Sequence, residues 1–202
     1  PLTFLVVRYT GVVVLMLVLA LVARAVWPPW RQAGHLAVAG IGIQAAYLGG
    51  VWVAVAQGMP SSVTALVVNL QPVLTALVGW AAGEHMGPRR AGGLVLGFLG
   101  VTLVVAEKLT TSGITALTLA LSGGALLAIT FGTLYQKRFC PEFDLRTGQV
   151  VQFVASIAVT APFALAFEDL RIDWTPAVIG ALVWSVVVLT GGGISLLFLM
   201  LR

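Results

Sequence analysis

Seven long apolar runs, separated by short polar breaks, organise this sequence. A helix needs about 20 apolar residues to cross the ~30 Å hydrocarbon core of a bilayer, and most of the runs reach that length. The breaks contain Pro, Gly and charged residues, which end helices. We therefore predict an all-α integral membrane protein, a multi-span helical bundle whose spans are Leu2–Ala23, Leu36–Ala56, Ser62–Gly83, Gly92–Ala106, Ile114–Tyr135, Gly148–Phe167 and Pro176–Leu201.

The fourth run is the shortest of the seven. At ~1.5 Å per residue, Gly92–Ala106 covers only ~22 Å. This helix must pack among its neighbours, thin the bilayer locally or extend past Glu107.

The composition excludes a water-soluble domain. Hydrophobic residues make up 59% of the 202 positions and charged residues only 9%, and the mean hydropathy is +1.05. Soluble domains carry about 25% charged residues, so there is too little polar surface here to cover a globule in water. Cys140 is the single cysteine and excludes an intrachain disulfide.

The positions of the charges predict the orientation in the membrane. Lys108 and Arg171 fall in breaks on one side, whereas eight cations fall on the other: Arg24, Arg31, Arg89, Arg90, Lys137, Arg138, Arg146 and Arg202. Cytoplasmic loops carry the excess of Lys and Arg. We therefore expect a multi-pass protein of the plasma or inner membrane, with the end of this chain cytoplasmic. This also explains the net charge of +4 without a nucleic-acid partner.

A weak internal repeat appears when the chain is compared with itself at an offset of 144 residues. Trp30 then meets Trp174, and Arg8 meets Gln152. The offset places the first span on the sixth, so the copies would have opposite orientations, as in the inverted repeats of secondary transporters. Chance similarity in an Ala-, Val-, Leu- and Gly-rich sequence is the alternative.

The third span carries amides and a proline at its centre. Pro72 has no N–H and displaces the carbonyl of Val68, so we expect a kink there. Gln71 and Thr75 share one helical face, and both can face a cavity. The alternative is that Gln71 holds two helices together, as buried polar side chains often do in membranes.

Other polar residues mark the first, second and sixth spans. Gln44 and Tyr47 lie on one stripe of the second span, and Gln152 lies about one turn inside the sixth. Arg8 either extends its side chain to the interface or faces inward toward an anionic solute or a carboxylate. Glu84 ends the third span, where a helix C-terminus disfavours negative charge, and we expect a nearby cation to hold it as a structural lock.

The sequence lacks the groups that intramembrane catalysis requires. No predicted span has an Asp, Glu, Lys or His at its centre, and the two histidines, His35 and His85, lie at the ends of predicted helices. We find no Ser/His pair at membrane depth, no metal-spaced ligand cluster and no phosphate loop. We therefore expect neither an enzyme nor a resident cofactor or metal.

Three segments resemble the EamA-type branch of the drug/metabolite transporter superfamily. They are PLTFLVVR (1–8), SSVTALVVNLQPVLTALVGWAAGE (61–84) and RRAGGLVLGFLGVTLV (89–104). The resemblance implies ten helices in two inverted five-helix repeats and transport of amino acids, other metabolites, sugars or drugs by alternating access. This chain would be an internal piece with seven of the ten spans. Residues 1–107 would form the first repeat without its first helix, and 113–202 the second without its last two.

Together these features predict a secondary membrane transporter for a small organic solute. Polar amides favour a neutral or zwitterionic solute, whereas Arg8 is also compatible with an anionic solute. Two alternatives remain, a non-transporting membrane scaffold or assembly protein and an intramembrane enzyme. The expected partners are the solute and the lipid bilayer. Gly79xxxGly83 and Gly93xxxGly97 permit close helix approach, which is compatible with a homodimer. The residues expected to line the path are Arg8, Gln44, Tyr47, Gln71, Thr75 and Gln152, with Pro72 as the point of bending.

Overall fold

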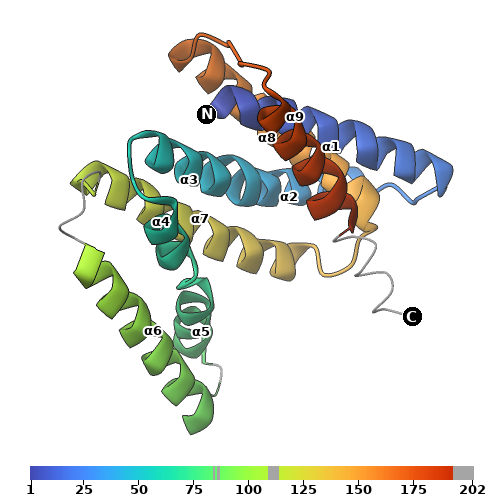
Figure 1. The fold of residues 1–202 in the computed structure, drawn as a ribbon. Helices are drawn as coiled ribbons and strands as arrows, with labels where there is room; N and C mark the ends of the chain where they lie inside the picture. The colour runs from blue at the N-terminus through green and yellow to red at the C-terminus, as the bar shows by residue number, and fades with distance from the viewer. Residues whose placement is uncertain (84, 86, 109–113, 193–202) are drawn as a thin grey trace. The chain divides into compact units, whose positions relative to one another are not determined.

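The computed structural model describes residues 1–83, 85, 87–108 and 114–192, and within these residues it contains helices and no strands (Figure 1). They group into two compact units. The first unit comprises Pro1–Ala45 with Tyr135–Arg202, and the second comprises Ala46–Leu134.

Nine α-helices and two π-helical segments follow one another along the described chain. They are α1 (Leu2–Val22), α2 (Trp30–Gly40), η1 (Ile41–Ala46), α3 (Tyr47–Ala56), α4 (Ser61–Val68), α5 (Gln71–Ala81), α6 (Pro88–Lys108), α7 (Ala116–Phe139), α8 (Leu145–Phe167), α9 (Pro176–Val183) and η2 (Trp184–Gly192). The π-helical segments η1 and η2 directly continue α2 and α9.

The predicted membrane bundle is confirmed. Among the described residues, the helices long and apolar enough to cross a membrane are Leu2–Val22, Trp30–Ala56, Ser61–Ala81, Ala116–Phe139 and Leu145–Phe167. Two shorter apolar helices, Ala91–Leu103 and Pro176–Val188, fall in the fourth and seventh predicted spans. Positions 193–201 of the seventh predicted span lie outside the described residues.

Several predicted helix boundaries were wrong: the fourth span begins at Pro88 instead of Gly92 and extends to Lys108, and the sixth begins at Leu145 instead of Gly148. Two further differences matter for the site. The second span begins at Trp30 instead of Leu36, directly after Pro29, which caps the helix in an extended conformation. The fifth span runs to Phe139 instead of Tyr135, since its last turn holds Lys137 and Arg138, where cations interact favourably with the helix C-terminus. As a result, His35 and the stretch 136–139 lie inside helices.

In the first unit, α1 and α8 pack against each other in antiparallel orientation (Figure 1). The start of α1 contacts the end of α8, where Leu2 N–H donates to Glu168 Oε1 at 2.7 Å. At the other end, Thr147 Oγ1 donates to Val26 O at 2.9 Å. Each helix buries one face, as its periodicity requires. The buried residues on α1 are Leu5, Tyr9, Val12, Met16 and Ala20, and those on α8 include Phe153, Ser156, Thr160 and Ala164.

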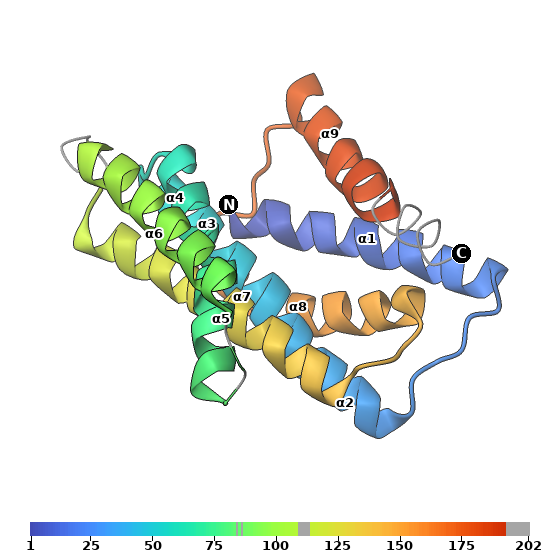
Figure 2. The ribbon, with the colours of Figure 1, turned by 90° about the horizontal axis from the view of Figure 1, so that it is seen from below.

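A glycine brings α2 against α8. A Cβ added to Gly40 would lie 2.6 Å from Gln152 Cα and 2.6 Å from its carbonyl oxygen, so only glycine allows this distance between the two backbones. The second π-helical segment contacts α1 in a similar way, with Val186 Cγ2 at 3.1 Å from a Cβ built on Gly11. Figure 2 shows the C-terminal end of α9, from which η2 continues, next to α1.

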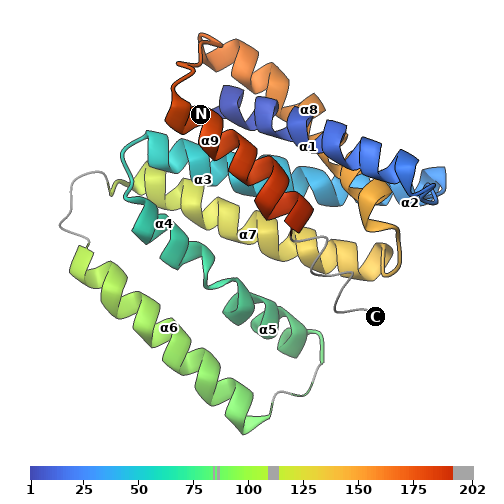
Figure 3. The same cartoon turned by 45° about the vertical axis from the view of Figure 1, so that its right-hand side comes forward.

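In the second unit, the third span is interrupted at the expected place. Helix α4 ends at Val68 and α5 begins at Gln71, with Pro72 in its first turn; Figure 3 shows the two as separate helices, with α6 along them. Because proline lacks an N–H, it is tolerated in a first turn and not in a helix interior.

The apolar core of the second unit forms where α3, α4 and α7 meet. Ala54, Met59 and Val63 are fully buried, and Ile114 and Leu121 pack against them. The thioether of Met59 also accepts a hydrogen bond from Ser122 Oγ at 3.1 Å, so a polar side chain of α7 is satisfied inside the core.

The contact at Gly40 makes a testable prediction about stability. We expect Gly40→Ala to lower the free energy of unfolding by about 1–3 kcal/mol, the usual effect of overpacking a close contact, because the new methyl group meets the backbone of Gln152. Thermal unfolding of the full-length protein in detergent measures the change.

The matched control for that substitution is Gly34→Ala in the same helix. A Cβ at position 34 has no atom within 4 Å, and alanine favours a helix over glycine by up to ~1 kcal/mol. Equal melting temperatures for the two variants would contradict the close contact between α2 and α8.

Candidate functional site

A group of hydrogen-bonded polar residues lies in the first unit, within helices that are otherwise apolar. We call it the polar cluster, and define it as Tyr9, Gln44, Gln136, Gln152 and Ser156, together with the carbonyl of Gly40. Its members come from α1, α2, η1, α7 and α8. Polar groups inside membrane spans are costly and tend to mark solute or ion pathways.

The π-helical segment η1 presents backbone carbonyls to this cluster. A change from α- to π-helical hydrogen bonding leaves carbonyls near the transition open to other donors, and such segments are frequent at functional sites. Tyr9 Oη donates to Gln44 O at 2.7 Å, and Ser156 Oγ shares its proton between Gly40 O at 3.0 Å and Gln152 O of its own helix at 2.7 Å. Side chains of α1 and α8 therefore supply hydrogen-bond donors to the second span.

Two glutamines pair across α7 and α8. Gln152 Nε2 donates to Gln136 Oε1 at 2.9 Å, and Gln152 is only 3% exposed. The pair satisfies one hydrogen bond of each amide and leaves further donor and acceptor capacity on both. Sequence reasoning assigned Gln136 to a loop and missed it, although Pro141 marks where the helix has to end.

A histidine and two aromatic rings connect α2 to the end of α7. His35 Nδ1 lies 2.7 Å from Tyr135 Oη, and its ring stacks on Phe139 with centroids 4.9 Å apart and an interplanar angle of 8°. The sequence did not predict this contact either, because it forms only when both helices are longer than expected.

Two buried oxygen atoms on α8 have no hydrogen-bond partner within the described part of the chain. They are Gln149 Oε1 and Thr160 Oγ1. A buried polar atom without a partner typically costs about 1–3 kcal/mol. This face of α8 therefore retains polar capacity beyond that used by Gln152 and Ser156.

The sequence-predicted residues of the first unit occupy different positions around the polar cluster. Gln152 is buried at its centre. Gln44 contributes its backbone carbonyl, which was not expected, and its side chain is half-buried. Arg8 is half-buried on α1, directly before Tyr9.

The other predicted residues belong to the second unit. Gln71 is half-buried, and its Nε2 donates to Thr133 Oγ1 of α7 at 3.4 Å, a long hydrogen bond. Thr75 and Tyr47 are half-buried on α5 and α3. A single path lined by residues of both units stays a prediction. Glu84 and its structural lock lie outside the described residues.

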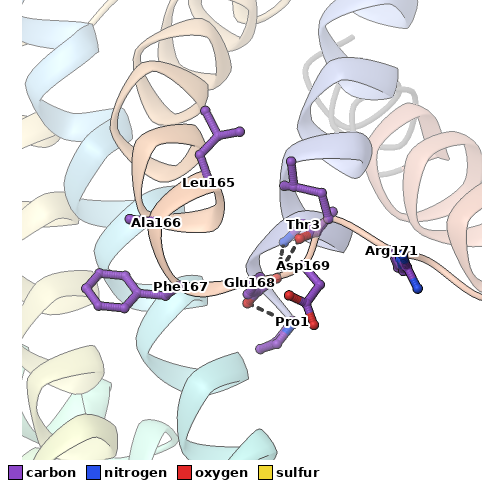
Figure 4. Close-up of a pocket in the computed structure, with 9 residues that line it drawn as sticks. Pro1, Thr3, Leu165, Ala166, Phe167, Glu168, Asp169 and Arg171 are labelled. Carbon is purple, nitrogen blue, oxygen red and sulfur yellow. Dashed lines mark hydrogen bonds and ion pairs between the residues drawn. The ribbon is translucent and has the colours of Figure 1, made fainter.

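A pocket of about 610 Å³ lies beyond the end of α8. It is lined by Pro1, Thr3 and residues 165–171, with Glu168 at its floor (Figure 4). The carboxylate of Glu168 accepts hydrogen bonds from the N–H groups of Leu2 and Thr3 at 2.7 and 2.8 Å and from Thr3 Oγ1 at 2.6 Å. It thereby caps the N-terminus of α1, where negative charge is favourable.

The same contacts set the ionisation of Glu168. Burial opposes the charged form, but the hydrogen bonds from Thr3 and Leu2 outweigh it and lower the pKa of the carboxyl well below its usual 4.5. Glu168 is therefore ionised at any physiological pH.

The structure brings together no metal centre in the part of the chain that it describes. Among those residues there is no group of three or more His, Cys, Asp or Glu placed to hold a metal ion.

Comparisons with known proteins agree with a membrane transporter. A family model described as the EamA-like transporter family matches residues 1–106, just over half of the chain. The chain is also similar to the "Uncharacterized transporter YvbV" of Bacillus subtilis (strain 168), with 28% identity over 142 residues. That match covers 70% of this chain and 42% of the relative, so the chain spans less than half of the relative's length. No solved structure matches significantly.

The cap formed by Glu168 predicts a pH-dependent contribution to stability. Because its pKa is lower in the folded state, the ionised carboxylate stabilises the fold above pH 4.5, and this stabilisation is lost as the pH falls toward 2. We expect Glu168→Gln to lower the melting temperature at pH 7 and to have little effect near pH 2. Melting curves of the full-length protein in detergent across this range provide the measurement.

The neighbouring carboxylate of the same pocket serves as the control for Glu168. Asp169→Asn removes a charge one residue away without touching the α1 cap. A pH dependence of the same size in Asp169→Asn would show that general charge, and not the cap, stabilises this end of the bundle.

Proposed function

Since the chain belongs to the EamA-like transporter family, we propose that it forms the central part of a secondary transporter that moves a small organic solute across a membrane by alternating access. Transport is proposed for the whole protein, because the related transporter is more than twice as long as the matched part of this chain.

The buried polar cluster is the observation that carries this proposal. A bundle that serves only as a scaffold is most stable with apolar contacts in its interior, because each amide placed there must lose its water. Here Gln136 and Gln152 meet close to the start of a π-helical segment, Tyr9 hydrogen-bonds to Gln44 of that segment, and Ser156 hydrogen-bonds to Gly40, the last residue of α2 before it. This concentration of polar groups near the middle of α8 supports a solute site.

The chemistry of the cluster favours a neutral or zwitterionic solute. Its groups are carboxamides, hydroxyls and backbone carbonyls, which exchange hydrogen bonds with polar solutes without fixing a charge. Arg8 directly precedes Tyr9 and Lys137 directly follows Gln136; a cation such as Arg8 would favour a carboxylate on the solute. We propose that the side chain of Gln44 also contributes to the solute site. Gln71, Thr75 and Tyr47 would line the path that the solute takes to this site.

Two repeats of opposite orientation, 1–107 and 113–202, form part of the proposal. At the offset of 144 residues, α1 corresponds to 146–166, and α8 spans Leu145–Phe167. The segment η1 corresponds to 185–190, and η2 spans Trp184–Gly192. Helices of matching length and type at matching places support the repeat more strongly than the sequence identities do.

The proposed topology places the end of this chain in the cytoplasm and the protein in the plasma or inner membrane. It is supported by the excess of Lys and Arg in alternate breaks. In this topology the pocket at Glu168 opens on the outer side. We also propose that the protein is not an enzyme, and a homodimer is compatible with the glycine motifs.

The glutamine pair allows a test that separates a solute site from a structural contact. Replacing both partners of a buried hydrogen bond by apolar groups of similar shape is often nearly neutral for stability. We expect the double variant Gln136→Leu/Gln152→Leu to fold but to lose transport by at least about tenfold, corresponding to ~1.4 kcal/mol of lost interaction. Uptake and efflux of a metabolite panel in vesicles with the full-length protein give the measurement.

The control for the glutamine pair is Gln57→Leu, which changes an exposed glutamine between two spans. Full transport by Gln136→Leu/Gln152→Leu, at the level of Gln57→Leu, would contradict the proposed site and favour the non-transporting scaffold.

The third span provides an independent prediction in the second unit. We expect Gln71→Ala to abolish or redirect solute binding while folding survives, because the 3.4 Å hydrogen bond to Thr133 is too long to contribute much stability. Thr133→Val is the control, since it removes the partner of Gln71, together with the Thr133 hydroxyl's bonds to carbonyls of its own helix, and leaves Gln71 in place. If Gln71→Ala and Thr133→Val have the same effect, Gln71 acts through its contact with α7 and not on the solute.

A further inference from the structure

One pair of equivalent residues in the proposed repeat is in direct contact. The offset of 144 residues places Tyr9 on Phe153, and the two rings pack against each other with centroids 5.3 Å apart and an interplanar angle of 51°. In a two-fold arrangement, a residue touches its own equivalent only on the axis. A pseudo-two-fold axis of the first unit therefore passes between Tyr9 and Phe153.

The buried faces of α1 and α8 obey the same relation. On α1 the buried residues from Tyr9 onward are Val12, Met16 and Ala20. Their equivalents on α8, Ser156, Thr160 and Ala164, are all buried as well. Because the two helices are antiparallel, these faces meet around the ring pair as the two halves of an inverted repeat would.

The two flanking contacts involve corresponding helices, although not corresponding residues. On one side of the axis, α2 and η1 lie against α8, with Gly40 next to Gln152. On the other side, η2 lies against α1, with Val186 next to Gly11. The equivalents of Val186 and Gly11 are Gly42 and Ala155, which lie two and three residues beyond the first contact.

The η1 and η2 contacts differ in their hydrogen-bond donors. On the η1 side, Tyr9 Oη donates to Gln44 O and Ser156 Oγ donates to Gly40 O. The equivalents of Tyr9 and Ser156 on the η2 side are Phe153 and Val12. Neither side chain has a hydrogen-bond donor, so the η2 contact cannot form the two corresponding bonds.

We propose that Tyr9 and Ser156 form a one-sided latch that holds η1 against α8 and α1 and biases the transporter toward one of its two facing conformations. The proposal rests on the proposed function, since it assumes that the two repeats exchange their arrangements during alternating access. Both contacts are formed in this structure. Opening the η1 contact would break the hydrogen bonds of Tyr9 and Ser156, whereas opening the η2 contact would break no equivalent bond, so the two open conformations differ in free energy.

Single substitutions of the hydroxyls test the latch in the full-length protein. Tyr9→Phe and Ser156→Ala each remove one donor, and Phe153→Tyr adds a hydroxyl on the η2 side. Cysteines introduced at equivalent positions, Ile41→Cys in η1 and Ser185→Cys in η2, report how often each contact opens. The background lacks native cysteines, including Cys140, and the probe is a small water-soluble maleimide.

The ratio of labelling rates at positions 41 and 185 is the quantity measured. Hydrogen bonds between membrane helices are individually weak, so we expect Tyr9→Phe and Ser156→Ala each to raise this ratio by about threefold to tenfold. Phe153→Tyr should lower it. The matched control is Tyr135→Phe, which removes the same hydroxyl from the contact with His35 in the same unit and should leave the ratio unchanged.

The possible outcomes separate the latch from simple packing and from the proposed function. If Tyr9→Phe and Ser156→Ala lower the melting temperature but leave the ratio at the value of Tyr135→Phe, the hydroxyls only stabilise the fold and the latch is refuted. If Phe153→Tyr fails to fold, the labelling ratios of Tyr9→Phe and Ser156→Ala alone test the latch. A shifted ratio in a protein that transports no solute would support the latch and contradict the proposed transport.

Discussion

A backbone carbonyl inside a membrane needs a hydrogen-bond donor, and the second span of this protein obtains two of them from other helices. Around the π-helical segment η1, the carbonyl of Gly40 at the end of α2 accepts from Ser156 and the carbonyl of Gln44 within η1 accepts from Tyr9. In hydrocarbon no water replaces such donors. The irregular turn therefore depends on α1 and α8 lying where they do, and α1, α2 and α8 form one connected arrangement around it.

Glycine makes that arrangement possible. Because Gly40 has no side chain, α2 approaches α8 closely enough for Ser156 to reach across. The same approach places the start of η1 near Gln152, whose amide then turns toward Gln136 of α7. The close contact between α2 and α8 therefore has two effects, since it packs this part of the bundle tightly and also brings the amides together.

The sequence predicted the membrane class, the approximate spans and the break at Pro72, because hydrophobic run length and proline chemistry act locally. It also selected Gln152, whose burial within a span follows from its place on a helical face. It could not predict Gln136 or the contact of His35 with Tyr135, since both depend on two helices continuing past polar residues. Gln44 was selected for its amide, whereas its carbonyl makes the contact, because no local pattern indicates a π-helical turn.

Polar groups are distributed unequally between α1 and α8, the two helices that the proposed repeat makes equivalent. Three apolar residues of α1, Leu5, Val12 and Met16, correspond to Gln149, Ser156 and Thr160 of α8. Two of these three have buried oxygens without a partner among the described residues. If both repeats had been selected only for packing, their facing surfaces would have kept similar chemistry. Along the buried faces that follow Tyr9, α1 supplies shape while α8 supplies hydrogen-bonding capacity, and Tyr9 does both because its ring packs on Phe153 while its hydroxyl reaches η1.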